Sequence, residues 1–201
     1  EFKLTILMAQ LPGMAYRCLN DKHWTMLYVS DGCAELTGYT PDELVNNKLI
    51  AFNEIIHPDD REAIRKTYTL KGNERHQFEQ LYRIITSTGI LKWVWEQGEA
   101  ALDDDGKIVL QGLILDITDR VEMEQDLRES QGRYQSLFEA SPDAILLTDL
   151  TGAIQVCNAR AAGLLDTPSA DALVGKNAID FLVPEDSLRI RSNLKLLIDE
   201  E

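Results

Sequence analysis

The chain is organised around Asp116-Ile117-Thr118-Asp119-Arg120 and the polar run that continues to Leu137-Phe138-Glu139-Ala140-Ser141. In this run, residues recur at alternating steps of four and three, all of them apolar except one serine: Met123, Leu127, Ser130, Tyr134 and Leu137. That spacing predicts a helix with one apolar stripe, as in the seam of a coiled coil. We expect the helix over 119–140, with Thr118 or Asp119 as its cap.

An apolar stripe on a helix between two globular units must pack against something. Two interpretations stay open: the helix folds back on its own domain, or it pairs with the same helix of a second chain. Ser130 and Gly132 interrupt the stripe. We favour the two-chain coil, whose seam would consist of Met123, Leu127, Tyr134 and Leu137.

The composition is that of a soluble globular protein. The chain has 201 residues, 44% hydrophobic and 27% charged, and a net charge of -14. A field of that sign repels phosphate backbones and anionic lipids, so we expect neither nucleic acid nor a membrane as a partner of this stretch. The three cysteines, Cys18, Cys33 and Cys157, form no CxxC pair, which favours a reducing cytoplasm.

The stretch before the central helix alternates between strand-like and helix-like patterns. An N-terminal helix over 1–11 ends at Pro12-Gly13 and is expected to cover a sheet. Thr40-Pro41-Asp42-Glu43 and His57-Pro58-Asp59-Asp60 have the signatures of helix starts. Five strand-like runs are separated by turn or helix signals: 14–19, 25–30, 77–86, 91–101 and 107–118. They predict an α+β fold with five antiparallel strands.

Several of these strands are apolar on both faces, as where Leu81 and Ile85 alternate with Tyr82 and Ile84. A sheet with one solvated face would alternate more cleanly. We therefore expect the helices of 31–70 on one face, and the N-terminal helix or a partner subunit on the other.

The order of patterns begins again after the central helix. Pro12 and Pro58 stand 46 residues apart (58 − 12), and Pro142 and Pro184 stand 42 apart (184 − 142), with strand, strand and helix signals between them. This spacing indicates an internal duplication. The second copy reaches Glu201 before its last three strands, so we expect it to be loosely packed or to dock on the first domain or a neighbouring chain.

Many short motifs together resemble a known family, the PAS domain with its C-terminal PAC segment. The motifs occur in the family's order over about 11–120: Leu11-Pro12-Gly13-Met14-Ala15-Tyr16-Arg17, Tyr28-Val29-Ser30, Leu36-Thr37-Gly38-Tyr39, Pro41-Asp42-Glu43-Leu44, His57-Pro58-Asp59-Asp60, Phe78 with Tyr82-Arg83-Ile84, Lys92-Trp93-Val94 and Asp116-Ile117-Thr118. Residues 141 to about 198 resemble the first half of a second PAS domain. Tandem domains of this kind are similar to those of prokaryotic sensor histidine kinases.

The resemblance implies a domain organisation: a capping helix over 1–11, a PAS/PAC domain over 12–118, a signalling linker helix over 119–140, and the N-terminal half of a second PAS domain over 141–201. It also implies a small-molecule-sized cavity, dimerisation, and output through the flanking helices. The candidate cavity residues are Tyr16, Tyr28, Leu36, Leu44, Phe52, Ile56, Phe78, Tyr82, Trp93 and Leu113. Aromatic and aliphatic residues at strand spacing more often form a plain hydrophobic core.

Neither of two cofactors common in the family is expected. Flavin-binding members carry a reactive cysteine in an Asn-Cys-Arg motif, whereas Cys33 follows Gly32. Haem-binding members use a histidine on the long helix, and 64–70 contains none. His57 lies at the start of that helix, where a capping role fits better. The ligand itself stays unknown.

No motif for catalysis or metal binding is evident. The run Asp103-Asp104-Asp105 is a turn ending in Gly106 and lacks the ligand spacing of a calcium loop. The most informative polar pair is Asp116 and Thr118, where the last strand passes into the linker helix. The pair is either a strand end with a cap, or a signalling joint that ties the helix to the sheet.

These observations lead to one main hypothesis and two alternatives. The chain is interpreted as a cytoplasmic sensory module of a two-component sensor histidine kinase that acts in a phosphorelay. It would form a homodimer through its N-terminal or linker helices, act on a downstream kinase domain, and respond to a small molecule or a partner. The alternatives are a ligand-free PAS dimerisation spacer, or the sensory part of another output enzyme such as a cyclic-dinucleotide cyclase. The fragment itself is not expected to be an enzyme.

Overall fold

The computed structural model describes residues 13–67, 76–103, 105–183 and 186. The chain divides into two compact units, Glu1–Glu124 and Gln125–Glu201. The helix predicted over 1–11 lies outside the described residues, as does the end of the helical stretch predicted over 31–70.

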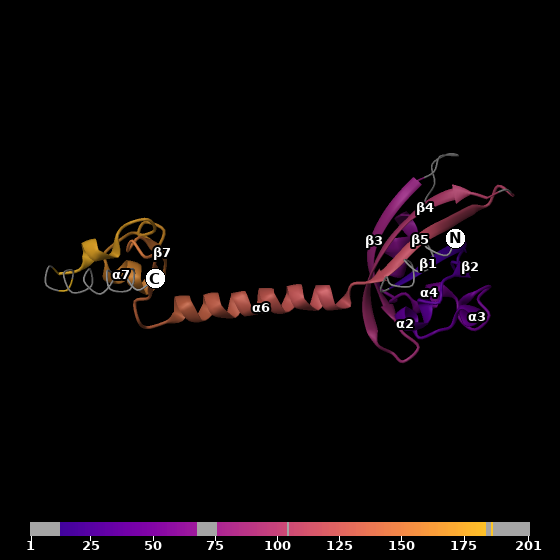
Figure 1. The fold of residues 1–201 in the computed structure, drawn as a ribbon, viewed down its shortest axis with the longest axis horizontal. Helices are drawn as coiled ribbons and strands as arrows, with labels where there is room; N and C mark the ends of the chain where they lie inside the picture. Colours follow the sequence, from indigo (N-terminus) through magenta and orange to yellow (C-terminus); the bar gives the residue numbers. More distant parts are fainter. Residues whose placement is uncertain (1–12, 68–75, 104, 184–185, 187–201) are drawn as a thin grey trace. The chain divides into compact units, whose positions relative to one another are not determined.

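The first unit is built on one antiparallel sheet of five strands (Figure 1). Its spatial order is β2-β1-β5-β4-β3, so the last strand lies between the first hairpin and the rest of the meander. The strands are β1 (Gly13–Leu19), β2 (Met26–Val29), β3 (His76–Ile85), β4 (Leu91–Leu102) and β5 (Ile108–Asp116). This confirms the predicted α+β fold with five antiparallel strands.

Four short helices between β2 and β3 cover the inner face of the sheet. They are α2 (Cys33–Thr37), α3 (Pro41–Leu44), α4 (Phe52–Ile55) and α5 (Arg61–Thr67). Thr40 and Glu43 form the predicted capping box at the start of α3, and Gly38 ends α2 with a φ of 79°. The helix α4 was not predicted, because four residues are too few to show a helical period.

The core of the first unit lies between these helices and the sheet. Two glycines, Gly98 and Gly112, face each other across β4 and β5 in the same row as Phe78 and Tyr16. A Cβ atom on Gly98 would lie 2.7 Å from Cζ of Phe78, and one on Gly112 would lie 2.2 Å from the carbonyl oxygen of Gln97. The glycines therefore leave room for the Phe78 ring and for close approach of the two strands.

The helix α6 (Thr118–Ala140) follows β5, and its first residues belong to the first unit and the rest to the second. Its observed bounds lie within one residue of the predicted 119–140. The second unit continues with β6 (Leu146–Thr148), β7 (Ile154–Cys157), α7 (Ala159–Leu164) and the 3-10 turn η1 (Ala178–Phe181). Strand, strand and helix thus follow in the same order as in the first unit.

The second unit has a small core within its described residues. Its buried members are Ile154, Cys157, Ala161, Ala162 and Leu173, three of which, the cysteine and the two alanines, have small side chains. All three residues of β6 are exposed. Between α7 and η1, residues 168–176 form a series of bends and turns.

Candidate functional site

The joint between the first sheet and α6 is a site where several polar side chains bond to one another. Asp116, the last residue of β5, accepts two hydrogen bonds through Oδ1 from Thr118: one from the backbone N–H at 3.0 Å and one from the hydroxyl at 2.6 Å. The ammonium group of Lys92 lies 3.0 Å from the other carboxylate oxygen. Asp116 thus bonds the first backbone N–H of α6 from outside the helix, and Thr118, one of the two residues expected to cap the helix, is itself the first helical residue.

Thr118 turns its hydroxyl toward the sheet. Its Oγ1 accepts a hydrogen bond from the backbone N–H of Trp93 on β4 at 3.0 Å. The backbone N–H of Ile117 donates to the carbonyl of Trp93 at 2.9 Å. The first turn of α6 is thus continuous with β5 through the chain and bonded to β4 through Thr118 and Ile117.

The surroundings of Asp116 stabilise its ionised form. Burial raises the pKa of its carboxyl, but hydrogen bonds from Thr118, followed by the hydrogen bond and charge of Lys92, outweigh burial and leave the pKa below its ordinary value. Asp116 is accordingly ionised at neutral pH, where it forms charge-assisted hydrogen bonds.

Lys92 connects the joint to a helix of the inner face. Besides its ion pair with Asp116, its Nζ donates to the carbonyl oxygen of Glu35 in α2 at 3.0 Å. A displacement of α2 against the sheet would therefore move one partner of Asp116.

A second connection reaches the joint from the start of α5. Asp60 accepts three hydrogen bonds from Arg83 on β3, from its backbone N–H, Nε and Nη2, at 2.9, 2.9 and 2.6 Å. The hydrogen bonds from Arg83 lower the pKa of Asp60. The guanidinium carbon of Arg83 lies 5.7 Å from the ring centroid of Trp93, within the range of a cation–π contact. The Asp60–Arg83–Trp93 chain thus ends at the residue that bonds Thr118.

The inner cavity of the first unit is small. Its volume is about 10 Å³, which is enough for one water molecule. It is lined by Tyr16, Cys18, Trp24, Met26, Phe52, Ile56, Ile64, Tyr82, Glu96, Leu110 and Ile114. Glu96 is buried and accepts a hydrogen bond from the Tyr16 hydroxyl, so the cavity has one acidic wall. A larger ligand would have to displace side chains of this wall.

The ten candidate cavity residues fall into three groups. Tyr16, Phe52, Ile56 and Tyr82 line the cavity. Leu36, Leu44 and Phe78 are buried in the core around it. Tyr28, Trp93 and Leu113 lie on the outer face of the sheet, where Tyr28 and Leu113 contribute to an open hollow of about 970 Å³.

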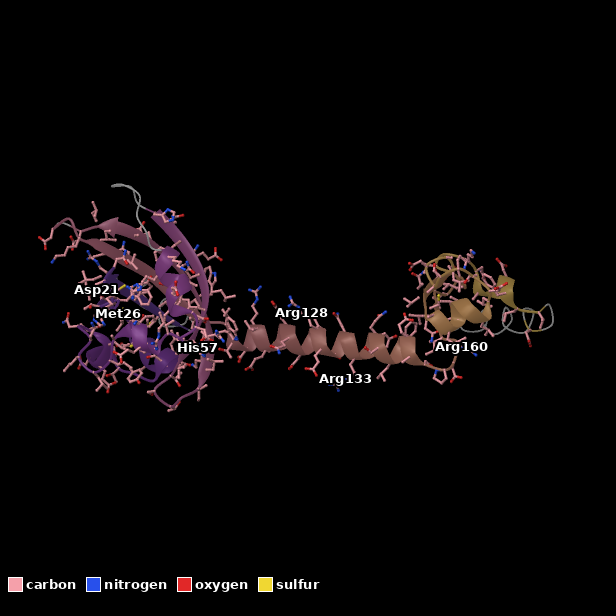
Figure 2. The ribbon with its side chains drawn as sticks, turned by 180° about the vertical axis from the view of Figure 1, so that it is seen from behind. Asp21, Met26, His57, Arg128, Arg133 and Arg160 are labelled. Atoms are coloured by element: carbon pink, nitrogen blue, oxygen red, sulfur yellow. The ribbon has the colours of Figure 1, made fainter. Side chains whose placement is uncertain are left out.

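The predicted seam residues of α6 are exposed in the single chain. Met123, Leu127, Tyr134 and Leu137 have exposed fractions of 69, 59, 64 and 69%. Charged side chains surround them, and Figure 2 shows Arg128 and Arg133 standing away from the helix axis. Ion pairs one turn apart, Arg120 with Glu124 and Arg133 with Glu129, support the helix itself.

The described residues give no support to a metal site, a membrane-spanning helix or a reactive thiol at Cys33. Among them, no group of three or more His, Cys, Asp or Glu side chains is placed to hold a metal ion. In the same residues, no helix combines the length and the apolar composition that a bilayer crossing requires. Burial raises the pKa of the Cys33 thiol to about 11, so this cysteine is a protonated core residue at neutral pH.

Comparison with known proteins agrees with the fold. Two family models, each described as a PAS fold, match residues 26–114 and 132–200. The chain belongs to the PAS family. It carries two PAS domains in tandem, with α6 leading from the first into the second.

Several relatives of this tandem PAS chain are named as sensor proteins. It is 34% identical over 128 residues to a methyl sulfide methyltransferase-associated sensor of Methanosarcina acetivorans, and 27% identical over 197 residues to the two-component sensor PprA of Pseudomonas aeruginosa. These matches cover 62 and 96% of this chain but only 12 and 20% of the relatives. A sensory box histidine kinase/response regulator of Burkholderia thailandensis, of known structure, is 25% identical, with a TM-score of 0.51; the match covers 67% of this chain and 99% of that one. The two domains are therefore PAS sensory domains of the kind found in larger signalling proteins.

Sequence reasoning found Asp116 and Thr118 but missed their partners. The sequence places Lys92 and Arg83 in family motifs and Asp60 at a helix start, but it does not indicate that they contact the joint, and it does not single out Glu96. Each makes its contact with a residue far away in the sequence, so no local pattern marks it. One sequence signal could have pointed to Glu96. It is an acidic residue in a predicted strand, and the residues two positions away from it face the core.

Proposed function

We propose that this tandem is the sensory module of a two-component sensor histidine kinase and passes a conformational bias from the first PAS domain into α6. The observation that carries the proposal is the joint, where Asp116 and Thr118 bond the first turn of α6 to two neighbouring strands. The relatives named as two-component sensors support the kind of output.

The mechanism is a shift between two populations of the first domain. A ligand or partner that favours one arrangement of α2 or α5 would act on the joint through Lys92 and through the Asp60–Arg83 pair. A signal with equal affinity for both arrangements would transmit nothing. The small cavity favours a signal that opens the domain or binds elsewhere on it, rather than one that fills an existing space.

The exposed seam of α6 supports homodimerisation as part of this function. Four large apolar residues at heptad-like spacing lie uncovered in the single chain. Pairing with a second α6 would bury them. A ligand-free dimerisation spacer remains the second candidate, because the seam supports it equally while the cavity is nearly filled.

The test is made in the full-length protein with Asp116→Asn. This substitution removes the charge that holds Lys92 and weakens the bonds from Thr118. We expect the rate of autophosphorylation with ATP to change by about fivefold or more, in the range of typical coupling energies. The kinase assignment itself is contradicted if the full-length protein incorporates no phosphate.

The matched control is Asp103→Asn. Asp103 also accepts two backbone hydrogen bonds in a turn of the first unit, from Asp105 and Lys107, but it does not touch α6. We expect it to leave the autophosphorylation rate within twofold of the wild type. If Asp116→Asn has no larger effect than Asp103→Asn, the relay role is wrong and the spacer function is favoured.

A further inference from the structure

Asn158 is the buried residue directly before α7 in the second PAS domain. Its side chain has no exposed surface, and all of its hydrogen-bonding groups are used. Oδ1 accepts from the backbone N–H groups of Ile145 and Ala161, each at 3.0 Å. Nδ2 donates to the carbonyl oxygens of Phe138 and Asp143, each at 3.0 Å. One amide group therefore bonds the end of α6, the start of β6 and the first turn of α7.

The bond to Phe138 lies in the last turn of α6, where carbonyl groups have no partner within the helix. Further contacts join the same two helix ends. Glu139 accepts from the backbone N–H of Ala159 at 2.9 Å, and Arg160, labelled in Figure 2, donates through Nε to the carbonyl of Pro142 at 3.2 Å. The Phe138 ring is buried and stacks on Tyr134. The end of α6 is thus fixed to the start of α7.

The first PAS domain lacks this arrangement at the corresponding position. Ser30 follows β2 as Asn158 follows β7, and its hydroxyl accepts from the backbone N–H of Ala15 at 2.9 Å. The backbone N–H of Ser30 donates to Ala15, as that of Asn158 donates to Ile145. Serine has no amide group with which to make two further donations. The bonds to Phe138 and Asp143 are therefore not required for pairing these two strands.

We infer that Asn158 is the positioning residue at the receiving end of α6, which delivers a displacement of that helix to β6 and α7 of the second domain. This inference rests on the proposed function, in which α6 carries the signal. Asp116 and Thr118 act at the first turn of the helix, and Asn158 acts at its last turn. A shift of the Phe138 carbonyl moves the amide of Asn158, and with it the amide's two acceptor bonds to Ile145 and Ala161.

The first experiment is hydrogen exchange of the 201-residue chain carrying Asn158→Ser, which gives the second domain the residue of the first. We expect backbone amides of residues 134–140 to exchange about tenfold faster, because the last turn loses a partner bond. Amides of β6 and β7 should stay within threefold of the wild type. Asn158→Asp serves as the second variant: its carboxylate keeps the acceptor role, loses the two donations and places a charged oxygen against the carbonyl oxygens of Phe138 and Asp143.

The matched control is Asn177→Ser. Asn177 caps η1, accepts from the backbone N–H of Ile179 at 3.0 Å and donates to the carbonyl of Thr151 at 3.0 Å, all within the second unit and away from α6. It should leave exchange of residues 134–140 unchanged. If both Asn158 variants leave that exchange unchanged, or if Asn177→Ser accelerates it equally, the inference is wrong.

The second experiment measures autophosphorylation of the full-length protein with Asp116→Asn and Asn158→Ser, singly and together. If Asn158 acts downstream of the joint, the double variant should have the same autophosphorylation rate as Asn158→Ser alone. Independent effects that multiply would contradict the inference. A silent Asp116→Asn would refute the proposed function, whereas normal exchange at 134–140 in the Asn158 variants would refute only the inference, so the two failures are distinguishable.

Discussion

At the scale of single residues, the first domain depends on two glycines that no turn requires. Gly98 and Gly112 sit inside long strands, where a glycine weakens the strand unless something occupies its space. Here the Phe78 ring lies over Gly98, and the backbone of β4 lies against Gly112. The tight strand contact holds β5 at the centre of the sheet, and α6 begins where β5 ends.

A pair of identical substitutions tests this packing. Gly112→Ala would place a Cβ atom 2.2 Å from a backbone oxygen, which cannot move without bending β4. We expect a loss of about 2 kcal/mol or more in the free energy of unfolding, as for overpacked cores. Gly132→Ala on α6 meets nothing within 4 Å and should stabilise the helix by about 1 kcal/mol. Urea denaturation measures the free energy of unfolding of both variants. Equal changes in the two variants would contradict the packing argument.

The sheet face to which a side chain points was predictable only where the strand is regular. Alternation correctly grouped Phe78, Tyr82 and Ile84 on one face of β3. It failed for Tyr28, because the β1–β2 pairing shifts register between Arg17 and Cys18. That irregularity places Met26 and Val29 inside and leaves Tyr28 55% exposed. A bulge of one residue is a tertiary event, and a strand of four residues contains no period that would reveal it.

At the scale of elements, the sequence indicates contacts between residues that are close together in the chain, but not contacts between residues that are far apart. The capping box of α3 joins Thr40 to Glu43, three residues away, and its spacing is written in the sequence. The bond from Lys92 to the end of α2 joins residues 57 positions apart. Side chains that meet only because a sheet brings two elements together leave no periodic trace. For this reason the sequence predicted Asp116 and Thr118 but not the two connections behind them.

The joint should respond to acid. The pKa values of Asp116 and Asp60 are both lowered in the folded chain, so their contribution to stability is present above the ordinary aspartate pKa of 3.8 and is lost as pH falls through the lower folded values. Asp116→Asn should therefore cost stability at pH 7, about 1 kcal/mol, and much less near pH 3. Urea denaturation of wild type and variant at the two pH values gives the difference.

The control for this pH dependence is Asp31→Asn, which changes an exposed aspartate of the same unit. It removes the same charge without removing the bonds of the joint. Its effect on stability should be small at pH 7 and should change little at pH 3. A loss from Asp116→Asn that is as large at pH 3 as at pH 7 would show that the charge of Asp116 does not stabilise the joint.

At the scale of the whole molecule, α6 belongs to both domains and is fastened differently to each. Its first turn is held by side chains of a sheet, through Asp116, Thr118 and the backbone of Trp93. Its last turn is held by the start of a helix, through Asn158. Between these ends, within residues 119–137, the helix exposes most of its surface. At 1.5 Å per residue, its 23 residues span about 35 Å, and over most of this length the described residues of the single chain give it no packing support.

A second copy of α6 would supply that support, and the seam makes this testable. We expect the purified chain to be a dimer by sedimentation equilibrium, because Met123, Leu127, Tyr134 and Leu137 are apolar, exposed and spaced as a seam. Leu127→Glu would place two charges face to face at the centre of the pair and should raise the dissociation constant at least tenfold. The matched control is Leu49→Glu. Leu49 is exposed to a similar extent, 63% against 59% for Leu127, but lies outside the helix. A wild-type monomer, or a dimer that both variants weaken equally, would mean that α6 relays as a single helix and that its apolar stripe serves another contact.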